Sequence, residues 1–322
     1  MIIAMCCTKN WYMKLQTGIY SLLSTNNVEK IYLFIEDDEI PGLKNNNKIK
    51  FININKLENY IKTTSPNYDS EYTKMSFIRC YFSKVLKCSK IIYVDADAIV
   101  VNDISYLWNL DLNDNVIAGV HEPGEWNKHL NGENFDDNYI NSGVLVMDLD
   151  KIREQHLDDR MIFLLNHNRY RFPDQDVINI VCKDKILHLS NIYNSTETTG
   201  MVENVKIIHY IRSKKGWIKS SPRSEIWFKW HYKFIESEDQ GMKNYNVIAT
   251  REFDDTVEGV HRIPYKQNYE FKCTAERYKF LKENNAVELV SIEKIEEAVI
   301  EEHVIESVKE EKPKKSYKKK NK

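Results

Sequence analysis

Short apolar runs alternate with amphipathic stretches through the first 240 residues of the chain. The runs predict buried strands, because they are short, rich in Ile and Val, and bounded by polar turns. They are Ile2–Cys7, Ile31–Ile35, Ile49–Ile54, Ile91–Val94, Val116–Val120, Tyr139–Met147, Ile186–Leu189 and Val205–Ile208. The predicted helices are Tyr12–Leu23, Tyr72–Leu86, Leu149–His167, a helix opened by Pro173, and Glu225–Glu236. Strands that alternate with helices in this way predict an α/β fold.

The pattern changes after Gln240. Residues 241–291 mix short extended runs with the helix-like stretch Thr274–Lys282 and the strand-like stretch Ala286–Val290. We therefore predict a main domain over residues 1–240, followed by a small accessory α+β unit over residues 241–291.

A third part follows over residues 292–322. It opens with a repeated five-residue unit of Glu, Val and Ile, and Lys312–Lys322 then holds seven lysines and no acid. A period of five fits neither helix nor strand, and like charges repel, so we predict a disordered, low-complexity tail. The alternative is a basic arm that binds an anionic surface.

Composition and charge narrow the class of protein. The chain of 322 residues is long enough for a full core, and its net charge of −2 gives no general attraction to nucleic acid. The six cysteines form no C-x-x-C pair, which favours reduced, packed thiols. No basic leader precedes the short N-terminal apolar run, and no window approaches the roughly 18–20 apolar residues of a membrane span. We predict a cytoplasmic protein with no membrane span and no sequence-specific nucleic-acid partner, and a homodimer stays open.

One strand runs directly into two carboxylates. Ile91–Val94 is followed by Asp95, Ala96 and Asp97. If the strand continues through the triplet, both aspartates lie on one face, because side chains two apart in a strand point the same way. Ligands of open α/β sheets bind beyond the carboxyl ends of the strands, where two carboxylates suit Mg²⁺ or Mn²⁺ with a diphosphate. Solvated acids are the ordinary alternative.

A histidine and a lysine follow a later strand. His209 comes directly after Val205–Ile208, and Lys215 lies six residues further on. Imidazole suits Mn²⁺ beside carboxylates, and the lysine could reach a phosphate held by that metal. The alternative for His209 is a hydrogen-bonded histidine at the edge of the core.

Two polar clusters suggest sugar recognition. Asn141 and Ser142 open a buried strand beside Gly143, which could let a ligand approach the backbone. Asp174 and Gln175 follow Pro173 at a predicted helix start, where an aspartate is also a favourable first-turn acid without any function.

The order of these elements along the chain is itself informative. In that order the chain resembles glycosyltransferase family 8, the glycogenin and lipopolysaccharide galactosyltransferase group, over about two-thirds of its length. The matching pieces are Thr8-Lys9-Asn10-Trp11-Tyr12, which resembles the family's Thr-Asn-Asp-x-Tyr turn, Arg79 sixteen residues before Asp95, Asp95-Ala96-Asp97, Asn141-Ser142-Gly143, Asp174-Gln175 and His209–Trp217.

The resemblance implies a GT-A type fold, with a mixed, mostly parallel sheet flanked by helices. It implies a retaining, Mn²⁺-dependent (or Mg²⁺-dependent) enzyme that moves a hexose from a UDP-sugar, UDP-glucose or UDP-galactose, to an acceptor. The acceptor could be a glycan, a protein or a lipid-linked sugar. The choice of acceptor is expected to lie in Gly124–Asn138, in Asn191–Asn204 or after Gln240.

The resemblance also implies roles for individual residues. The metal ligands are Asp95, Asp97 and His209. The donor-binding residues are Thr8, Asn10, Tyr12, Arg79, Asp95, Ala96, Asn141, Ser142, Asp174 and Lys215. The catalytic residues are Gln175, Asp174 and Arg79, with Gln175 as the candidate nucleophile if the reaction is a double displacement. If the leaving diphosphate itself takes the acceptor proton, no protein base is needed.

The chain departs from the family pattern in three places. Arg212 stands where the family usually has glycine, and Gly216 stands where it has proline. The first departure bears on how the backbone approaches the diphosphate. Between Asn194 and His209 there is no tyrosine, so self-glucosylation of the glycogenin type is not supported.

Two other functions fit parts of the pattern. A nucleotidyltransferase acting on sugar phosphates also needs acidic metal ligands, but it should carry a glycine-rich loop after the first strand, and residues 7–10 contain no glycine. A catalytically inactive sugar-nucleotide-binding protein could keep the same fold. Intact Asp95, Asp97, His209 and Lys215 argue against that loss of activity.

Overall fold

The computed structural model describes residues 1–68, 74–122, 130, 138–198, 202–240, 245–249, 253–257, 260–265, 267–268, 270–273, 282 and 287–292. The chain divides into two compact units, Met1–Gly241 with Asp254–Pro264, and Met242–Phe253 with Tyr265–Lys322. The predicted helix Thr274–Lys282 (apart from Lys282), most of the predicted loop Gly124–Asn138 and the predicted tail lie outside the described residues.

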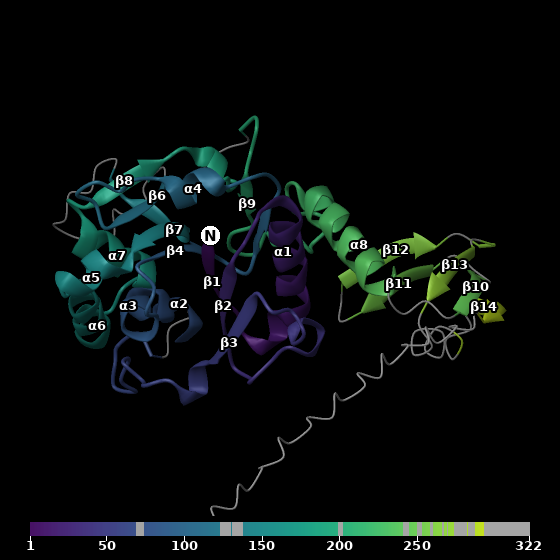
Figure 1. Ribbon diagram of the computed structural model, residues 1–322, viewed down its shortest axis with the longest axis horizontal. Coiled ribbons are helices and arrows are strands. Elements are labelled where there is room, and N and C mark those ends of the chain that lie inside the picture. Colours follow the sequence, from purple (N-terminus) through teal and green to yellow (C-terminus); the bar gives the residue numbers. More distant parts are fainter. Residues whose placement is uncertain are drawn as a thin grey trace, which may run out of the picture. The chain divides into compact units, whose positions relative to one another are not determined.

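A seven-stranded mixed sheet forms the centre of the first unit (Figure 1). Its strand order is β3-β2-β1-β4-β7-β6-β8. The strands are β1 (Ile2–Cys6), β2 (Lys30–Ile35), β3 (Ile49–Asn53), β4 (Lys90–Val94), β6 (Ile117–His121), β7 (Ile140–Asp148) and β8 (Ile186–Leu189). The first four strands of that order run parallel, β7 is antiparallel to both of its neighbours, and β6 is parallel to β8.

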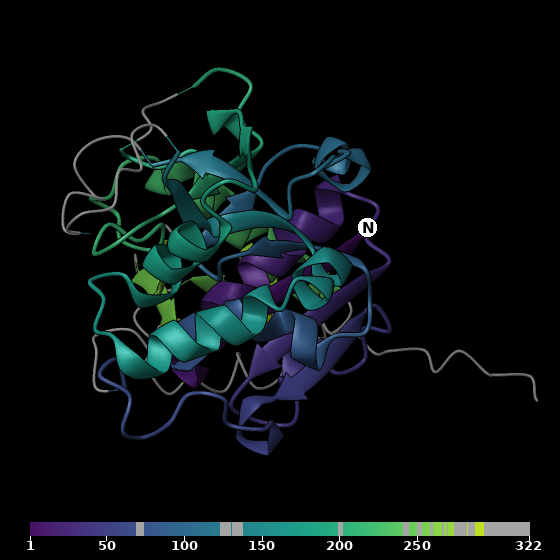
Figure 2. The same cartoon turned by 90° about the vertical axis from the view of Figure 1, so that its left-hand side faces the viewer.

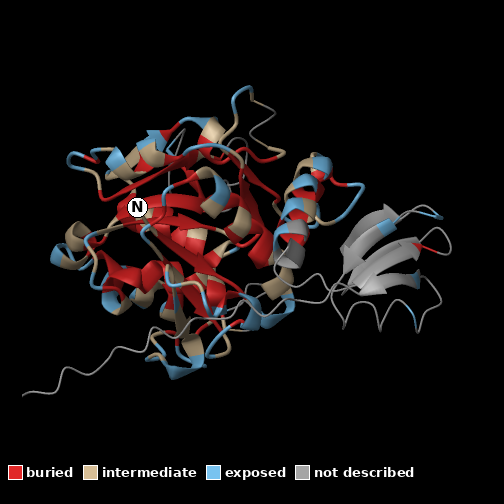
Figure 3. Cartoon of the chain, turned by 45° about the vertical axis from the view of Figure 1, so that its right-hand side comes forward, coloured by how far each residue is buried: buried red, intermediate tan, exposed pale blue. Residues whose placement is uncertain are grey.

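Both faces of this sheet are buried. Ile3 and Met5 of β1 belong to one apolar cluster, which includes α1 (Tyr12–Thr25), whereas Ala4 and Cys6 belong to another. The second cluster includes α5 (Leu149–Glu154), α6 (Leu157–His167) and α7 (Pro173–Cys182), which cross in front of the sheet in Figure 2. Because successive side chains of a strand are buried on opposite faces of the sheet, the strands are continuous apolar runs in the sequence. Figure 3 shows these strands as the buried centre.

A second, two-stranded layer lies beside the sheet. β5 (Ala98–Val100) pairs antiparallel with β9 (Ile207–His209), and α1 packs against β5 and against α8 (Ser224–Gln240). The sequence pattern did not predict β5 or the short helix α4 (Ser105–Asn109).

Two predicted helices are interrupted. The stretch Tyr72–Leu86 is built from α2 (Lys74–Phe77), a 3₁₀ turn (Ile78–Tyr81) and α3 (Phe82–Val85). Every residue from 77 to 83 is buried, so packing on all sides overrides the single helical face that the spacing suggested. The stretch Leu149–His167 breaks between α5 and α6, where His156 adopts a left-handed φ of 53°.

The second unit contains an antiparallel sheet of order β13-β10-β14, formed by β13 (Glu270–Cys273), β10 (Tyr245–Ala249) and β14 (Val287–Ile292). The strand predicted at Ala286–Val290 corresponds to β14. A two-stranded sheet that pairs β11 (Phe253–Val257) with β12 (Val260–Tyr265) belongs mostly to the first unit, which includes Asp254–Pro264. None of the helices in the described part of the chain has the length and apolar character needed to cross a bilayer.

Candidate active site

A cavity of about 420 Å³ opens beyond the carboxyl ends of β1, β4 and β6 and the start of β7. Most of the predicted site residues line it, namely Thr8, Arg79, Asp95, Ala96, Asp97, Asn141, Ser142, Asp174, Gln175, His209 and Lys215. Asn10 and Tyr12 are not among its lining residues. The Tyr12 hydroxyl instead accepts hydrogen bonds from the backbone N–H groups of Glu36 (3.1 Å) and Asp37 (3.3 Å), at the end of β2.

The two aspartates converge through a turn. β4 ends at Val94, and Asp95–Asp97 form a turn before β5, so the strand does not continue through the triplet. The register of β5 on β9 places Ala98 opposite His209, which brings the turn beside the imidazole. The two carboxylates are therefore not aligned by the alternation of side chains along a strand, as the sequence suggested. The pairing of β5 with β9 brings them together instead.

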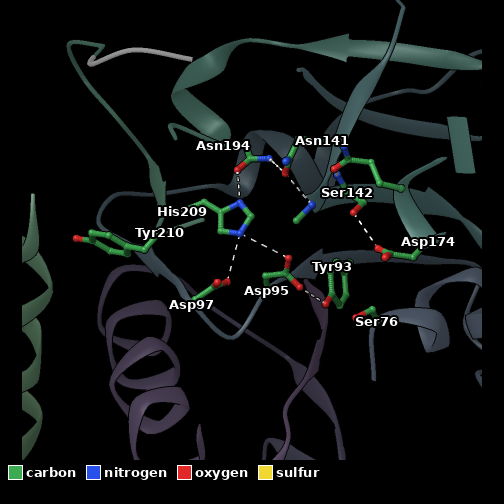
Figure 4. A network of polar contacts seen from close by, with 12 residues as sticks. Ser76, Tyr93, Asp95, Asp97, Asn141, Ser142, Asp174, Asn194, His209 and Tyr210 are labelled. Atoms are coloured by element: carbon green, nitrogen blue, oxygen red, sulfur yellow. Dashed lines mark hydrogen bonds and ion pairs between the residues drawn. The ribbon is translucent and has the colours of Figure 1, made fainter. Parts of the chain in front are cut away.

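Asp95, Asp97 and His209 form a candidate metal centre (Figure 4). Nε2 of His209 lies 3.2 Å from Oδ1 of Asp97 and 3.6 Å from Oδ2 of Asp95, and one ligand atom of each residue lies within 4.8 Å of the others. Burial alone would raise the pKa of Asp97, but His209 and Lys215 outweigh it and hold that pKa well below its ordinary value. Two carboxylates and an imidazole are a donor set that fits Mn²⁺.

A chain of hydrogen bonds fixes the tautomer of His209. The backbone N–H of Gly143 donates to Oδ1 of Asn141 (2.9 Å), so this atom must be the amide oxygen. Nδ2 of Asn194 donates to the same oxygen (2.8 Å), which leaves Oδ1 of Asn194 as the acceptor for Nδ1–H of His209 (2.9 Å; Figure 4). With the proton on Nδ1, the lone pair on Nε2 faces the two aspartates, as a metal ligand requires.

The glycine of the Asn141-Ser142-Gly143 element has a specific packing role. A Cβ at Gly143 would lie 2.1 Å from Cε1 of His209 and 2.9 Å from Oδ2 of Asp95. No side chain fits in that space, so the glycine lets the imidazole and the carboxylate approach each other. The sequence suggested that it makes room for a ligand, and the structure shows that it makes room for His209.

Arg79 links the metal centre to a second group of polar residues. Its guanidinium is 5% exposed, contacts Oδ1 of Asp95 at 2.8 Å and Oδ2 of Asp174 at 3.3 Å, and donates to the backbone oxygen of Ser142 at 2.8 Å. Burial would lower the pKa of Arg79, but Asp95, Tyr93 and Asp174 together raise it well above the ordinary value. Arg79 therefore stays charged and holds two carboxylates at fixed positions.

Gln175 is held on both sides of its amide. Its Oε1 accepts the backbone N–H of Ser142 at 3.0 Å, and its Nε2 donates to the hydroxyl of Tyr139 at 3.2 Å. Tyr139 in turn donates to Oδ1 of Asp176 at 2.5 Å. The orientation of the Gln175 amide therefore follows from a backbone donor and from a buried tyrosine–aspartate pair.

The loop after β9 carries two of the basic residues of the pocket, Lys215 and Arg212. Nζ of Lys215 lies 2.5 Å from Oδ2 of Asp97, donates to the backbone oxygen of Tyr210 at 3.1 Å, and sits 5.1 Å from the ring centroid of Trp11. Trp11 packs edge-on against Trp217, with ring centroids 4.9 Å apart. Arg212 lines the same pocket and has a left-handed φ of 56°.

Three residues around this site were not predicted from the sequence. Glu122 lines the pocket and is 5% exposed, and its carboxylate accepts from Nδ2 of Asn141 (2.6 Å) and from Thr198 (2.9 Å). It follows β6 directly, so the strand-end reasoning used for Asp95 could have found it. Trp11 lines the pocket where Tyr12 was expected. Asn194 carried no signal, because its role depends on contacts distant in sequence.

Comparisons with known proteins agree with this geometry. The family model for glycosyl transferase family 8 matches residues 2–221. General stress protein A of Bacillus subtilis (strain 168) is 26% identical over 259 residues, which cover 67% of this chain and 87% of that protein. Lipopolysaccharide 1,2-glucosyltransferase of Escherichia coli (strain K12) is 30% identical over 154 residues, 42% of this chain and 46% of that protein, so the chain spans about half the length of this relative.

The fold has a match among solved structures. The galactosyltransferase LgtC, crystallised with donor and acceptor sugar analogues, superposes with a TM-score of 0.56 at 19% identity, covering 72% of this chain and 95% of that one. This likeness confirms the GT-A type α/β fold expected from the sequence. Because the family model covers well over half of the sequence and its motifs meet in one pocket, the chain belongs to glycosyl transferase family 8.

Proposed function

We propose that this glycosyltransferase moves a hexose, glucose or galactose, from a UDP-sugar to an acceptor with retention of anomeric configuration, and that it depends on Mn²⁺. The observation that carries the proposal is the convergence of Asp95, Asp97, His209 and Lys215 in one pocket with a buried set of sugar-binding residue types. The names of two similar proteins, a glucosyltransferase and a galactosyltransferase, support the choice of hexose.

Asp95, Asp97 and Nε2 of His209 would hold the divalent cation, which when bound supplies Lewis-acid stabilisation of the departing diphosphate. The chain adds its own charge at that place. Nζ of Lys215 is fixed beside Asp97 by its hydrogen bond to the Tyr210 carbonyl, so a cation already stands where negative charge develops on the leaving group.

The buried residues around Arg79 are suited to orient the transferred sugar. Asp174 is 4% exposed, and burial raises the pKa of its carboxyl, against the opposing influence of Arg79. Ser142 donates its hydroxyl hydrogen bond to Oδ2 of Asp174 at 3.0 Å. Oxygen acceptors held in this way can accept hydrogen bonds from sugar hydroxyls at fixed positions. Trp11 presents an indole at the same pocket and is the candidate platform for the nucleobase.

We propose that Gln175 positions the sugar and that the leaving diphosphate takes the acceptor proton. The carboxylates that line the pocket each accept hydrogen bonds or ion pairs from the described protein, Asp95 and Asp174 from Arg79, Asp97 from Lys215, and Glu122 from Asn141. Oε1 of Gln175 is likewise engaged by Ser142 N–H. A lone pair tied up in this way is a weaker nucleophile, which favours attack from the face of the departing diphosphate over a double displacement.

A panel of UDP-sugars tests the proposal. With Mn²⁺ we expect release of UDP from UDP-glucose or UDP-galactose, slowly to water and faster when the acceptor is present, and no release in excess EDTA. The anomeric configuration of the product, read by NMR, should match that of the donor. Synthesis of a nucleotide sugar from a nucleoside triphosphate and a sugar 1-phosphate would favour a nucleotidyltransferase. Tight UDP binding with no turnover of any donor would indicate an inactive binding protein.

We also propose that the transferase domain ends near residue 240. The residues that select the acceptor are proposed to lie in Gly124–Asn138, in Asn191–Asn204 or beyond Gln240. Deletion of residues 296–322 should leave turnover of the donor unchanged if the tail takes no part in catalysis. A loss of turnover would instead assign the tail a role.

A further inference from the structure

Arg212 occupies a backbone conformation that disfavours its own side chain. Its φ of 56° lies in the left-handed region, where a Cβ is costly and glycine is the usual residue. Several of the other left-handed residues are asparagines, which tolerate this region, such as Asn113 and Asn204. A strained arginine needs a compensating interaction.

A second left-handed arginine shows what such compensation looks like. Arg223 has a φ of 60°, and its guanidinium donates to Oγ of Ser195 at 2.8 Å and to the backbone oxygen of Ser195 at 3.0 Å. Its side chain therefore ties two segments of the protein together. Arg212 differs in its location, because it lines the pocket that holds Asp95, Asp97 and Lys215.

The charge of the pocket points to the ligand that Arg212 would meet. The described lining residues include four carboxylates, Asp95, Asp97, Glu122 and Asp174, and three cationic side chains, Arg79, Arg212 and Lys215. Arg79 is shared between two of the carboxylates, and Lys215 is paired with a third. Arg212 adds a third positive charge to the lining of this acidic pocket, which favours entry of a strongly anionic ligand.

We propose that the Arg212 guanidinium binds the diphosphate of the sugar-nucleotide donor, beside Lys215. The inference rests on the proposed function, since that function supplies a diphosphate ligand. The loop keeps the left-handed conformation in which glycine is expected, so the arginine adds a side-chain contact without altering the path of the backbone. A guanidinium suits phosphate oxygens because its N–H groups form a planar fork that can bind them in pairs.

The proposal predicts opposite effects of one substitution on stability and on binding. Arg212→Gly should relieve the backbone strain, so the protein should melt at the same temperature as the wild type or higher. The same variant should bind UDP about 10-fold or more weakly in Mn²⁺, measured by isothermal titration calorimetry, because a charge-assisted contact to the ligand is lost. Arg212→Lys should fall between the two. Binding of uridine, which has no phosphate, should be unaffected.

Two matched variants serve as controls. Lys214→Gln removes one positive charge from the same loop, but Lys214 is paired with Glu197 at 2.8 Å and is absent from the pocket lining, so UDP affinity should change by less than about 3-fold. Asn113→Gly places glycine at another exposed left-handed position (φ 48°) that lies outside the pocket lining and should change melting temperature only.

The outcomes separate this proposal from the one it rests on. If wild-type protein binds UDP in Mn²⁺ and Arg212→Gly binds it equally well, the diphosphate contact is wrong while the transferase function stands. An equal loss in Lys214→Gln would show a general charge effect and would also overturn the contact. If the wild type binds neither UDP nor any UDP-sugar, the proposed function falls first, and the role of Arg212 falls with it.

Discussion

The pocket has two sides that are built in different ways. The phosphate side consists of Asp97 from the turn after β4, His209 from the last position of β9, and Lys215 from the loop after β9. The sugar side consists of Arg79, Ser142, Asp174 and Gln175, which come from the short helices before β4, from β7 and from α7. Asp95 lies between them and contacts both His209 and Arg79.

The two sides differ in how their polar groups are satisfied. On the sugar side, Arg79, Ser142 and Asp174 are almost fully buried and bond to one another, so the group is rigid before any ligand arrives. On the phosphate side, the aspartate, imidazole and ammonium converge on one point with their ligand atoms facing inward. Substitutions on the phosphate side should therefore cost mainly ligand binding, whereas loss of Arg79 on the sugar side should cost more stability as well.

The largest effect is expected from Asp97→Asn on the phosphate side. The variant should lose metal-dependent turnover, by about 1000-fold or more, because it removes a charged ligand from a three-residue centre. Its fold should persist, but its free energy of unfolding without metal should fall by about 1–2 kcal/mol, because pairing with His209 and Lys215 outweighs burial and lowers the pKa of Asp97 in the folded protein. Circular dichroism and chemical denaturation measure the second quantity.

Asp38→Asn is the matched control for that variant. Asp38 also pairs with a lysine at 2.5 Å, here Lys56, but its side chain is 66% exposed and lies outside the pocket lining. Its activity should equal that of the wild type. Wild-type turnover of Asp97→Asn at saturating Mn²⁺ and donor would remove Asp97 from the metal centre.

Arg79→Lys tests the sugar side. Lysine keeps the charge but cannot contact Asp95, Asp174 and the Ser142 carbonyl together, so unfolding free energy should fall by about 2–4 kcal/mol and turnover by about 100-fold. Arg153→Lys is the control, because Arg153 also donates to several backbone carbonyls but lies outside the pocket lining. It should lose stability without losing activity. Unchanged stability of Arg79→Lys would contradict the contrast between the two sides.

The metal-ligand candidates of the phosphate side could be predicted from the sequence more readily than the residues that hold them in place. Asp95, Asp97 and His209 lie at the ends of predicted strands or just beyond them, so a local pattern sufficed to select them, although β4 and β9 belong to different sheets and are brought together by the pairing of β5 with β9. Asn194 could not be predicted, because it reaches His209 only through the bridge between Ser195 and Ile208. Such a contact depends on the fold and leaves no trace in local spacing.

The same limit explains the other differences. Asn141 was expected to bind sugar from its residue type, yet its amide oxygen accepts from Gly143 and Asn194 and forms part of the support for His209. The amphipathic spacing of Tyr72–Leu86 predicted one helix, but burial of residues 77–83 on all sides is a property of the packed core. Where a residue type or a spacing is compatible with two roles or two structures, tertiary contacts determine which one is found.

Asn194 supplies a prediction about the support of the phosphate side. Asn194→Leu removes the acceptor for Nδ1–H of His209, and Mn²⁺ affinity should fall about 10–100-fold, read by electron paramagnetic resonance without donor. Asn194→Asp keeps an acceptor for Nδ1–H but loses the donor to Oδ1 of Asn141, so its Mn²⁺ affinity should fall less than that of the leucine variant. Wild-type Mn²⁺ affinity in the leucine variant would show that the tautomer of His209 does not depend on Asn194.

The smallest effect is expected from Asp174→Asn, through the pH dependence of stability. Burial raises the pKa of Asp174 in the folded protein above its ordinary value of about 3.8, so the folded state binds this proton more tightly than the unfolded state does. The carboxylate therefore costs stability once pH rises above that ordinary value, and asparagine removes the cost. The free energy of unfolding of Asp174→Asn relative to wild type should rise between about pH 4 and 7, by an amount on the order of 1 kcal/mol, since asparagine still accepts the Ser142 hydroxyl. Asp38→Asn should show the opposite trend and at lower pH, below about pH 4, because hydrogen bonds from Lys56 and Asn53 lower the pKa of Asp38. If the stability of both variants changed with pH in the same direction, burial would not control the ionisation of Asp174. The proposed electrostatic difference between the buried sugar side and the exposed surface would then be wrong.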